Sequence, residues 1–413
     1  MTTRFLLPLL LAALAAPAAR ADGNPWSLGV SQTVSRSSNL LRLPADAAVP
    51  AGFSRADTVS STALLAGLDQ PFGRQRAYGN LSLRADRLSN NRIYDNEGYA
   101  LAGGLDWATV ERVSGTLRAS ANRTLADFYA DEIGFLPNKN LQTTGEIDNT
   151  VRIGVVTDWT AELNGTIRSV DYSADEYQSR EFRERSAGAS LRYSPGGAGS
   201  IGLGLRETRG RYPRFRTAAD GTPLPDHFAR SDLDLSGSLQ PSGASRLAAR
   251  VSLARIRYDI ASQRDFSGVT GLLRWTWQPT GKLRLETRLT RDPSQSSYFS
   301  DSADAAADAT VDYSRMTTTL LWRADWQATA KLAFNTRFTH ARRALTRTLS
   351  GSGSAVDGRD RRTVLEAGVD WAPTRSLRLG CNLARDQRSG DASTLSSDYR
   401  DNTLACSARF TLQ

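Results

Sequence analysis

The sequence predicts an all-β fold: a transmembrane, antiparallel, up-and-down β-barrel of about 18 strands, an even number as in bacterial barrels. Apolar and polar residues alternate in segments of about nine residues or more, which is long enough to cross a bilayer at a tilt. Short and long connections alternate between these segments. Tryptophan recurs where a segment meets a short turn, and aromatic residues mark the bilayer interface in such barrels.

The first residues predict a signal peptide rather than part of the fold. Arg4 supplies a positive charge, residues 5–16 form a short apolar stretch, and Ala19-Arg20-Ala21 matches an A-x-A cleavage pattern. The stretch is shorter than the ~20 apolar residues of a membrane-spanning helix. We therefore expect residues 1–21 to be a signal peptide and residues 22–413 to form one barrel in a bacterial outer membrane.

A short sequence recurs three times near the C-terminal end. The copies are Trp277-Gln-Pro-Thr-Gly-Lys-Leu283, Trp326-Gln-Ala-Thr-Ala-Lys-Leu332 and Trp371-Ala-Pro-Thr-Arg-Ser-Leu377. They are 49 and 45 residues apart, which is about the length of a strand, a turn, a strand and a long loop. Each tryptophan is the last outward residue before the turn. The predicted periplasmic aromatic girdle consists of Trp107, Trp159, Trp277, Trp326 and Trp371.

The alternation also assigns the two faces of each strand. In residues 269–277 the apolar side chains at odd positions would face lipid, while Arg274 would face the lumen. A soluble sandwich alternates too, but its strands are usually shorter and its polar face meets bulk water. The predicted lumen-facing side chains are Arg274, Arg284, Arg288, Arg323, Arg337, Glu366 and Arg378. A barrel of about 16–18 strands encloses an aqueous channel.

Eight short turns rich in Pro, Gly, Thr and Ser alternate with nine longer polar stretches. The turns are predicted near residues 69–75, 108–112, 157–160, 195–199, 241–245, 279–281, 328–330 and 372–376. The longer stretches are predicted near residues 35–58, 87–98, 126–140, 173–181, 213–229, 259–265, 293–312, 346–361 and 387–399. Barrels keep short turns in the periplasm and long loops outside, so both termini should be periplasmic.

The net charge is +9, and 49 of the 52 basic residues are arginine, the exceptions being Lys139, Lys282 and Lys331. The arginines are spread along strands, and no nucleic-acid recognition module is visible, so we expect no nucleic-acid partner. Guanidinium groups pair bidentately with carboxylates and phosphates. Outer-membrane lipid and lipopolysaccharide phosphates are therefore expected partners. Contact with these phosphates, together with general surface polarity, is the simpler explanation for the many arginines.

The sequence indicates no catalytic, cofactor or metal site. The two histidines, His227 and His340, have no Cys or His partner at metal-ligand spacing. A Ser-His-acid triad around His340, which would make the protein an outer-membrane hydrolase, stays open because triads are defined by geometry. The carboxylates of the strands are instead expected to pair with lumen arginines. They are Asp106, Asp325, Asp370 and Glu366.

The two cysteines, Cys381 and Cys406, lie on the last two predicted strands, equally far from the middle of the loop that joins them. Both share the face of their apolar neighbours. Because the periplasm is oxidising, a cross-strand disulfide is one expectation. The alternative is a pair of small apolar side chains that face lipid.

Five segments carry a family resemblance through their order and spacing. They are Ser38-Asn-Leu-Leu-Arg-Leu-Pro44, Asp57-Thr-Val59, Gln70-Pro-Phe-Gly-Arg-Gln-Arg76, Arg209-Gly-Arg-Tyr-Pro213 and Asp265-Phe-Ser-Gly-Val-Thr-Gly271, the last running into Trp275-Thr-Trp-Gln-Pro-Thr-Gly-Lys-Leu283. Over essentially the whole mature chain they resemble the exopolysaccharide biosynthesis outer-membrane protein family called EpsL, whose members are porin-like β-barrels. The chain departs from the terminal Phe common in outer-membrane proteins, because Phe410 precedes Thr-Leu-Gln413.

The resemblance implies a non-enzymatic outer-membrane conduit for a secreted glycan. Its cargo would be an exopolysaccharide chain, and its partner a periplasmic polysaccharide export protein. Lumen arginines would bind uronic acids or acyl substituents weakly enough for the chain to keep moving, the balance that also governs ion pores. The alternatives are a general diffusion porin for small solutes, a structural or adhesive barrel with a closed lumen, and an outer-membrane hydrolase.

Overall fold

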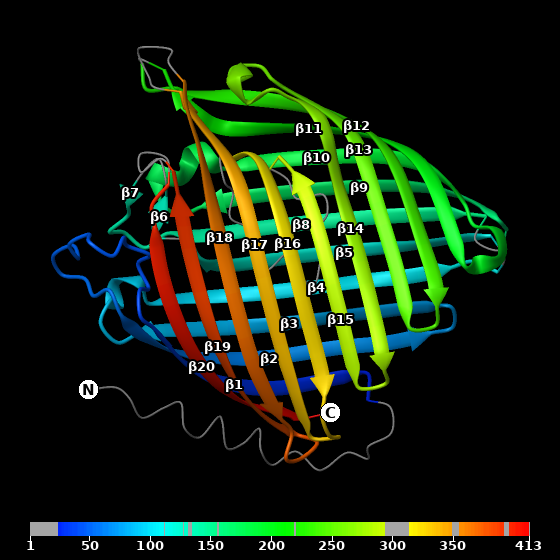
Figure 1. Ribbon diagram of the computed structural model, residues 1–413, viewed down its shortest axis with the longest axis horizontal. Helices are drawn as coiled ribbons and strands as arrows, with labels where there is room; N and C mark the ends of the chain where they lie inside the picture. Colours follow the sequence, from blue (N-terminus) through cyan, green and yellow to red (C-terminus); the bar gives the residue numbers. More distant parts are fainter. Residues whose placement is uncertain are drawn as a thin grey trace.

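The computed structural model describes residues 24–412 except 111, 127, 131–133, 155–156, 219, 294–313, 349–354 and 392–395. The expected signal peptide lies outside the described residues. Among the described residues, no helix is long and apolar enough to cross a membrane. An antiparallel sheet of 18 strands makes up almost all of the fold (Figure 1), and this confirms the predicted fold class.

The strands of this sheet are β1 (Trp26–Ser37), β2 (Asp57–Phe72), β3 (Gln75–Leu88), β4 (Asn96–Ala108), β5 (Val113–Leu125), β8 (Leu141–Ile153), β9 (Trp159–Tyr172), β10 (Phe182–Tyr193), β11 (Gly199–Thr217), β12 (Pro223–Ser242), β13 (Ser245–Tyr258), β14 (Phe266–Thr280), β15 (Leu283–Asp292), β16 (Ser314–Gln327), β17 (Leu332–Thr348), β18 (Ala355–Trp371), β19 (Leu377–Gly390) and β20 (Tyr399–Leu412). β6 (Tyr129–Ala130) and β7 (Gly134–Phe135) form a small separate sheet. Four short 3-10 helices complete the described elements: η2 (Arg92–Tyr94), η3 (Asp175–Arg180), η4 (Pro195–Gly197) and η5 (Ser262–Arg264).

The sheet closes on itself because β1 pairs with β2 on one side and with β20 on the other. Closure leaves no unpaired edge, and this is the condition that lipid imposes on a β-structure that spans it. In Figure 1 the strands of the near wall cross those of the far wall at a steep angle, as expected when strands tilt relative to a barrel axis.

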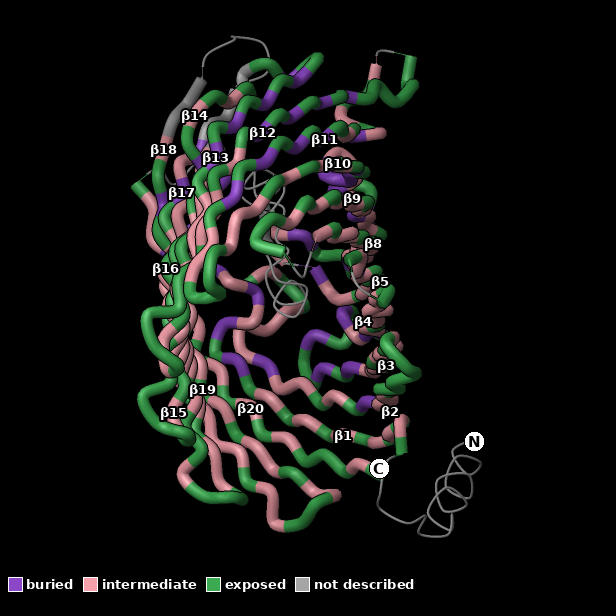
Figure 2. Tube along the Cα trace, turned by 90° about the vertical axis from the view of Figure 1, so that its right-hand side faces the viewer, coloured by how far each residue is buried: buried purple, intermediate pink, exposed green. Residues whose placement is uncertain are grey.

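Large apolar side chains cover the outside of the barrel. Leu205 is 65% exposed, Leu253 is 59% exposed and Leu383 is 61% exposed, and each alternates with an inward residue that is less exposed. Figure 2 shows this alternation of exposed and buried residues along β11, β12 and β13. A water-soluble monomer rarely exposes so large an apolar surface, so this face lies against lipid.

The eight short turns occur where the sequence predicts them, with strand boundaries within a few residues. Two of the predicted long loops are shorter than expected. Most of 213–229 belongs to β11 and β12, which project as a hairpin around residues 218–222. The register of that hairpin shifts between Tyr212 and Arg216, next to Pro213, which has no N–H to donate. Its outward face is no longer apolar, so the alternation that reveals a strand is lost.

The predicted loop 346–361 is also mostly strand, because β17 continues to Thr348 and β18 begins at Ala355. The predicted loop 293–312 lies outside the described residues except for its first position. The remaining turns and loops follow the expected rule of short turns at one end and longer connections at the other. The start of β1 and the end of β20 lie at the end that carries the short turns, since Trp26 is opposite Leu68 and Leu28 is opposite Leu412.

The predicted girdle tryptophans all lie on outward-facing positions close to short turns. Trp159, Trp277, Trp326 and Trp371 are exposed at the ends of their strands. Trp107 packs more closely, because its ring covers Gly115 on the neighbouring strand and a Cβ there would lie 2.4 Å from the ring. The sequence analysis omitted Trp26, which is exposed at the start of β1 and lies at the same end of the barrel.

At the opposite end, three connections pack against one another around Tyr94. Its ring centroid is 5.7 Å from that of Phe53, which follows β1, and 4.4 Å from that of Phe128, which follows β5. Burial raises the pKa of Tyr94 to about 12, so the phenol stays protonated and donates a hydrogen bond to the Leu136 carbonyl at 2.9 Å. This apolar cluster orders the extracellular connections on one side of the barrel.

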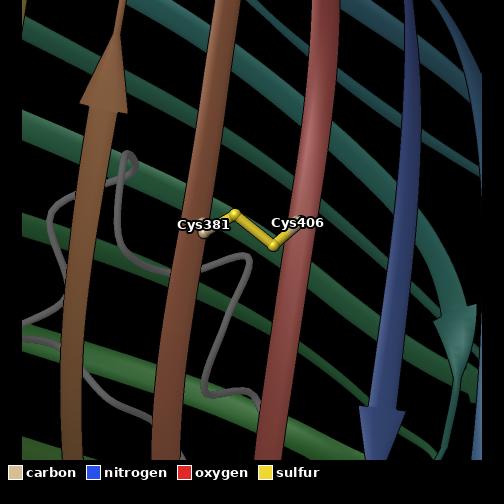
Figure 3. The surroundings of a disulfide bond; sticks show 2 residues. All are labelled: Cys381 and Cys406. Atoms are coloured by element: carbon tan, nitrogen blue, oxygen red, sulfur yellow. A yellow bond between two sulfur atoms is a disulfide. The ribbon is translucent and has the colours of Figure 1, made fainter.

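Cys381 on β19 and Cys406 on β20 are directly opposite in the register, and a disulfide joins them (Figure 3). Their Cα atoms are 4.1 Å apart. Both residues are exposed and belong to the outward face, with Leu383 and Leu404 as the next outward residues. The bond therefore links the last two strands on the side that faces lipid.

We expect unreduced protein, isolated from the outer membrane and digested with protease, to give one linked peptide pair that contains Cys381 and Cys406. The cysteines are 25 residues apart, and closing such a loop stabilises a protein by ~3 kcal/mol in the chain-entropy model. Mass spectrometry before and after reduction provides the measurement and its control. Two free thiols in the unreduced sample would show that the register of the final hairpin differs from the one described.

Candidate functional site

The inner wall of the barrel carries a row of charges that begins on β14 and β15. Arg274 and Arg288 are directly opposite each other in the register. Both guanidiniums approach Glu286, at 3.6 Å for Arg274 Nε and 3.0 Å for Arg288 Nη2. Two arginines thus share one carboxylate on the same wall.

The row continues across β16, β17 and β18. Glu286 is opposite Arg323, Arg323 is opposite Arg337, and Arg337 is opposite Glu366. The Arg323 side chain lies 2.8 Å from Asp325 and the Arg337 side chain lies 3.8 Å from Glu366. These two arginine side chains are 42% and 32% exposed, so they are accessible from the interior. The wall therefore presents four arginines and three carboxylates in adjoining register positions.

The remaining predicted lumen residues lie near the end of the barrel that carries the short turns. Arg284 is exposed and lies opposite Asp325. Arg378 is exposed and lies opposite Arg409, a residue that the sequence analysis did not include. The alternation along β20 places Arg409 inward, so this signal was present in the sequence. Basic side chains therefore face the interior near the periplasmic opening.

The strand carboxylates have different partners from place to place. Asp325 and Glu366 pair with Arg323 and Arg337, as expected. Asp370 instead accepts a hydrogen bond from Asn335 Nδ2 at 3.2 Å. Asp106 lies opposite Arg76, whose guanidinium makes a bidentate pair with Asp69 at 2.6 Å and 2.7 Å.

A second inner-wall network lies nearer the extracellular end, on β11, β12 and β15. The Arg230 side chain is 1% exposed and contacts Asp232 at 2.8 Å and Asp292 at 3.1 Å. Arg206 approaches Asp232 at 3.5 Å and Asp234 at 3.2 Å. These groups are buried and paired, so they hold the wall together rather than offering open charges to a solute.

A third network joins β17, β18, β19 and the connection after β19. Arg343 makes a bidentate ion pair with Asp360, and Ser396 donates a hydrogen bond to the same carboxylate at 2.7 Å. One strand along, Arg362 pairs with Asp386 at 2.8 Å. The sequence analysis missed Asp360 and Ser396 because it assigned them to the loops 346–361 and 387–399, where alternation carries no information about facing.

The inner wall near the extracellular end is partly aromatic. Phe182, Tyr212, Phe228 and Tyr258 lie on successive strands from β10 to β13, with neighbouring ring centroids 5.5–6.0 Å apart. All four are buried. Sequence reasoning assigned no facing to these positions, because Phe228 lies in the predicted loop 213–229 and the other three border predicted loops.

Both histidines lie on the outward face, away from the lumen. His340 Nδ1 is 2.9 Å from the Thr363 hydroxyl, and Arg342 donates a hydrogen bond to its Nε2 at 3.4 Å. His227 lies on β12 beside Asp259, with 3.6 Å between Nδ1 and Oδ2. Within the ranges that the structure describes, no group of three or more His, Cys, Asp and Glu residues is arranged to hold a metal ion.

The buried network gives a prediction for stability. Replacing Arg230 with Ala would leave Asp232 and Asp292 without their shared cation, and removing one partner of a buried pair costs about 3–5 kcal/mol. We expect the free energy of unfolding to fall by about that amount. The measurement is urea unfolding of protein refolded in lipid vesicles, followed by tryptophan fluorescence. Arg246→Ala is the control. Arg246 is exposed, and within the described residues its side chain donates a hydrogen bond only to the amide oxygen of Gln240. Equal losses in the two variants would contradict the prediction.

Comparisons with known proteins give distant structural similarities and no sequence relative. No family model matches the chain, so membership of the EpsL-like family is not shown. No curated protein matches it. Among solved structures, the outer membrane protein OpdK from Pseudomonas aeruginosa is similar to this chain, with 13% sequence identity and a TM-score of 0.46. The match includes 94% of this chain and 99% of OpdK. OccK2 (OpdF) of the same organism, solved in complex with glucuronate, covers 94% over 98% of its own chain, at 14% identity and a TM-score of 0.47.

The siderophore receptor PirA from Acinetobacter baumannii covers 95% of this chain over 81% of its own, at 7% identity and a TM-score of 0.43. With TM-scores below 0.5, these similarities carry no argument about this protein. The protein's own geometry places it in the bacterial outer membrane. A closed antiparallel sheet, an apolar outer face and a charged inner wall together define a porin-like outer-membrane β-barrel.

Proposed function

We propose that the protein is a diffusion channel for small solutes that prefers anions. The observation that supports this most directly is the arginine surplus on the inner wall from β14 to β20. Arg323 and Arg337 are partly exposed there, and Arg378 and Arg409 face each other near the periplasmic opening. A surplus of one sign of charge along a narrow aqueous path raises the local concentration of the opposite ion.

Paired carboxylates are part of this proposal. An isolated arginine would bind an anion and hold it, whereas an arginine that already shares a carboxylate binds a passing anion weakly. Glu286 between Arg274 and Arg288, and Glu366 beside Arg337, provide that balance. Transport needs sites that are favourable to enter and easy to leave.

The exopolysaccharide outlet implied by the family resemblance has less support. Sugar rings stack on exposed aromatic faces, but the inner aromatic row is buried: Phe182 and Tyr212 are each 1% exposed and Phe228 is 6% exposed. Lumen arginines suit uronic acids and small anions alike. The inner wall therefore favours the diffusion channel over the outlet.

The two readings differ in a bilayer experiment. A diffusion channel conducts as the purified protein alone, whereas an outlet that works with a periplasmic export protein would be silent until that partner docks. We expect the mature wild-type protein to open channels in a planar bilayer. In a potassium chloride gradient, the sign of the reversal potential should show that chloride is more permeant than potassium.

Arg337→Glu tests whether the wall sets this preference. Reversing one unit charge about 8 Å from a passing ion changes their interaction by about 1 kcal/mol in water, and screening in ~0.1 M salt reduces this change to about half. Because the change is unfavourable for chloride and favourable for potassium, the two effects add, and the chloride-to-potassium permeability ratio should fall about fivefold. Arg342→Glu is the matched control, since Arg342 lies on the same strand, β17, but faces outward. An unchanged ratio in Arg337→Glu, or an equal change in the control, would show that this wall does not line the ion path.

A further inference from the structure

Arginines face each other on the outer surface of the barrel near its extracellular end. Arg183 on β10 is directly opposite Arg211 on β11, and Arg185 is directly opposite Arg209. All four are exposed, and their parity is that of the lipid-facing residues of the same strands. Two like-charged pairs thus lie side by side on one face.

Two further arginines extend this group across β12 to β13. Arg257 is opposite Ala229, and Ala229 is opposite Arg209, so Arg209 and Arg257 flank a residue with only a methyl side chain. Two strand spacings separate their backbones by about 10 Å. Arg255 lies two residues from Arg257 on the same exposed face. The rim arginine patch consists of Arg183, Arg185, Arg209, Arg211, Arg255 and Arg257.

Acidic side chains neutralise little of this charge. In the described ranges, Arg183 is the patch member that makes an ion pair, with Asp171 at 3.7 Å, and both side chains are largely exposed. Glu207 is the outward acid on β11 and lies opposite Ala187 and Ser231 rather than opposite an arginine. Like charges directly opposite each other on an antiparallel pair are destabilising. The patch is therefore a surface that a bound anion would relieve.

The position of the patch along the strands indicates where that anion comes from. Towards the periplasmic end the same outward face is apolar, with Leu205, Leu203 and Ile201 exposed on β11 and Leu253 and Val251 exposed on β13. These side chains lie against acyl chains. The patch follows them at the extracellular side, at the level where the headgroups of the outer leaflet begin.

We propose that the rim arginine patch binds the phosphates of lipid A, the membrane anchor of lipopolysaccharide. One molecule of this lipid joins a phosphorylated sugar headgroup to acyl chains, and the barrel presents arginines directly beyond a lipid-facing apolar surface. Guanidinium groups match phosphate oxygens bidentately. The opposed pairs allow one phosphate to contact guanidiniums from both β10 and β11, and the gap at Ala229 leaves room for a headgroup beside Arg209 and Arg257.

The binding test uses the mature protein folded in detergent micelles and titrated with hexa-acylated, bisphosphorylated lipid A, with native mass spectrometry as the readout. Arg185→Gln/Arg209→Gln removes the charges of one opposed pair and keeps an unbranched, polar side chain at each position. We expect its affinity to fall by about tenfold or more, because charge-assisted hydrogen bonds are lost. Lipid A with the same acyl chains but no phosphates should bind wild-type protein as weakly as bisphosphorylated lipid A binds the variant.

The matched control is Arg36→Gln/Arg385→Gln. These arginines are also exposed and outward near the extracellular end, but Arg36 lies opposite Leu404 and Arg385 lies opposite Leu365 and Asn402. We expect this variant to keep lipid A affinity within about twofold of wild type, because it removes no opposed pair. Equal losses in the two double variants would overturn the assignment to this patch and indicate a general basic belt.

Stability provides a second readout that does not depend on binding measurements alone. Without lipid A, removal of the opposed pair relieves repulsion, so Arg185→Gln/Arg209→Gln should unfold at the same or a higher urea concentration than wild type. Addition of bisphosphorylated lipid A should raise the urea midpoint of wild type more than that of the variant. Full-strength binding to the variant, or equal binding of lipid A without phosphates, would overturn the proposal.

Discussion

Lipid offers no hydrogen-bond partner to a polypeptide backbone, and the rest of this structure depends on that constraint. Each spanning strand must be paired along both edges, and the pairing of β1 with both β2 and β20 meets the requirement for the whole chain. Because successive side chains point to opposite faces, closure of the sheet directs each strand side chain either towards lipid or towards the lumen. A slip of one residue in β16 would turn Trp326 inward and Arg323 into lipid, so the register is strongly specified.

That sorting explains why so many charges can coexist in a membrane protein. Inward positions collect arginines and carboxylates that pair across neighbouring strands, buried and tight around Arg230, more open around Arg323 and Arg337. The buried networks support the wall, while the open row gives the interior its sign of charge. Outside, the same chemistry would face phosphates instead of carboxylates. In the two functions proposed above, one arginine-rich composition serves the wall, the solute path and the membrane contact.

Sequence alone predicted what depends on local pattern. Turn positions, strand facing and the opposition of Cys381 and Cys406 follow from alternation and symmetric loop closure. Features that depend on where the membrane ends were not predictable in the same way. The β11–β12 hairpin and the start of β18 continue as strands beyond the apolar band, where alternation fades, so their inward residues Tyr212, Phe228 and Asp360 went unrecognised. The alternating pattern also does not specify the function, and no family model supports the EpsL-like resemblance.

The central claim is that alternate residues of each strand face lipid and a water-filled lumen. Nitroxide labels placed singly at residues 335–341 of β17, in protein reconstituted into lipid vesicles, test it most directly. Accessibility to oxygen, which concentrates in lipid, should peak at positions 336, 338 and 340. Accessibility to a polar nickel reagent should peak at 335, 337, 339 and 341. Loss of this two-residue period, its opposite phase, or inward sites closed to both reagents would contradict the account.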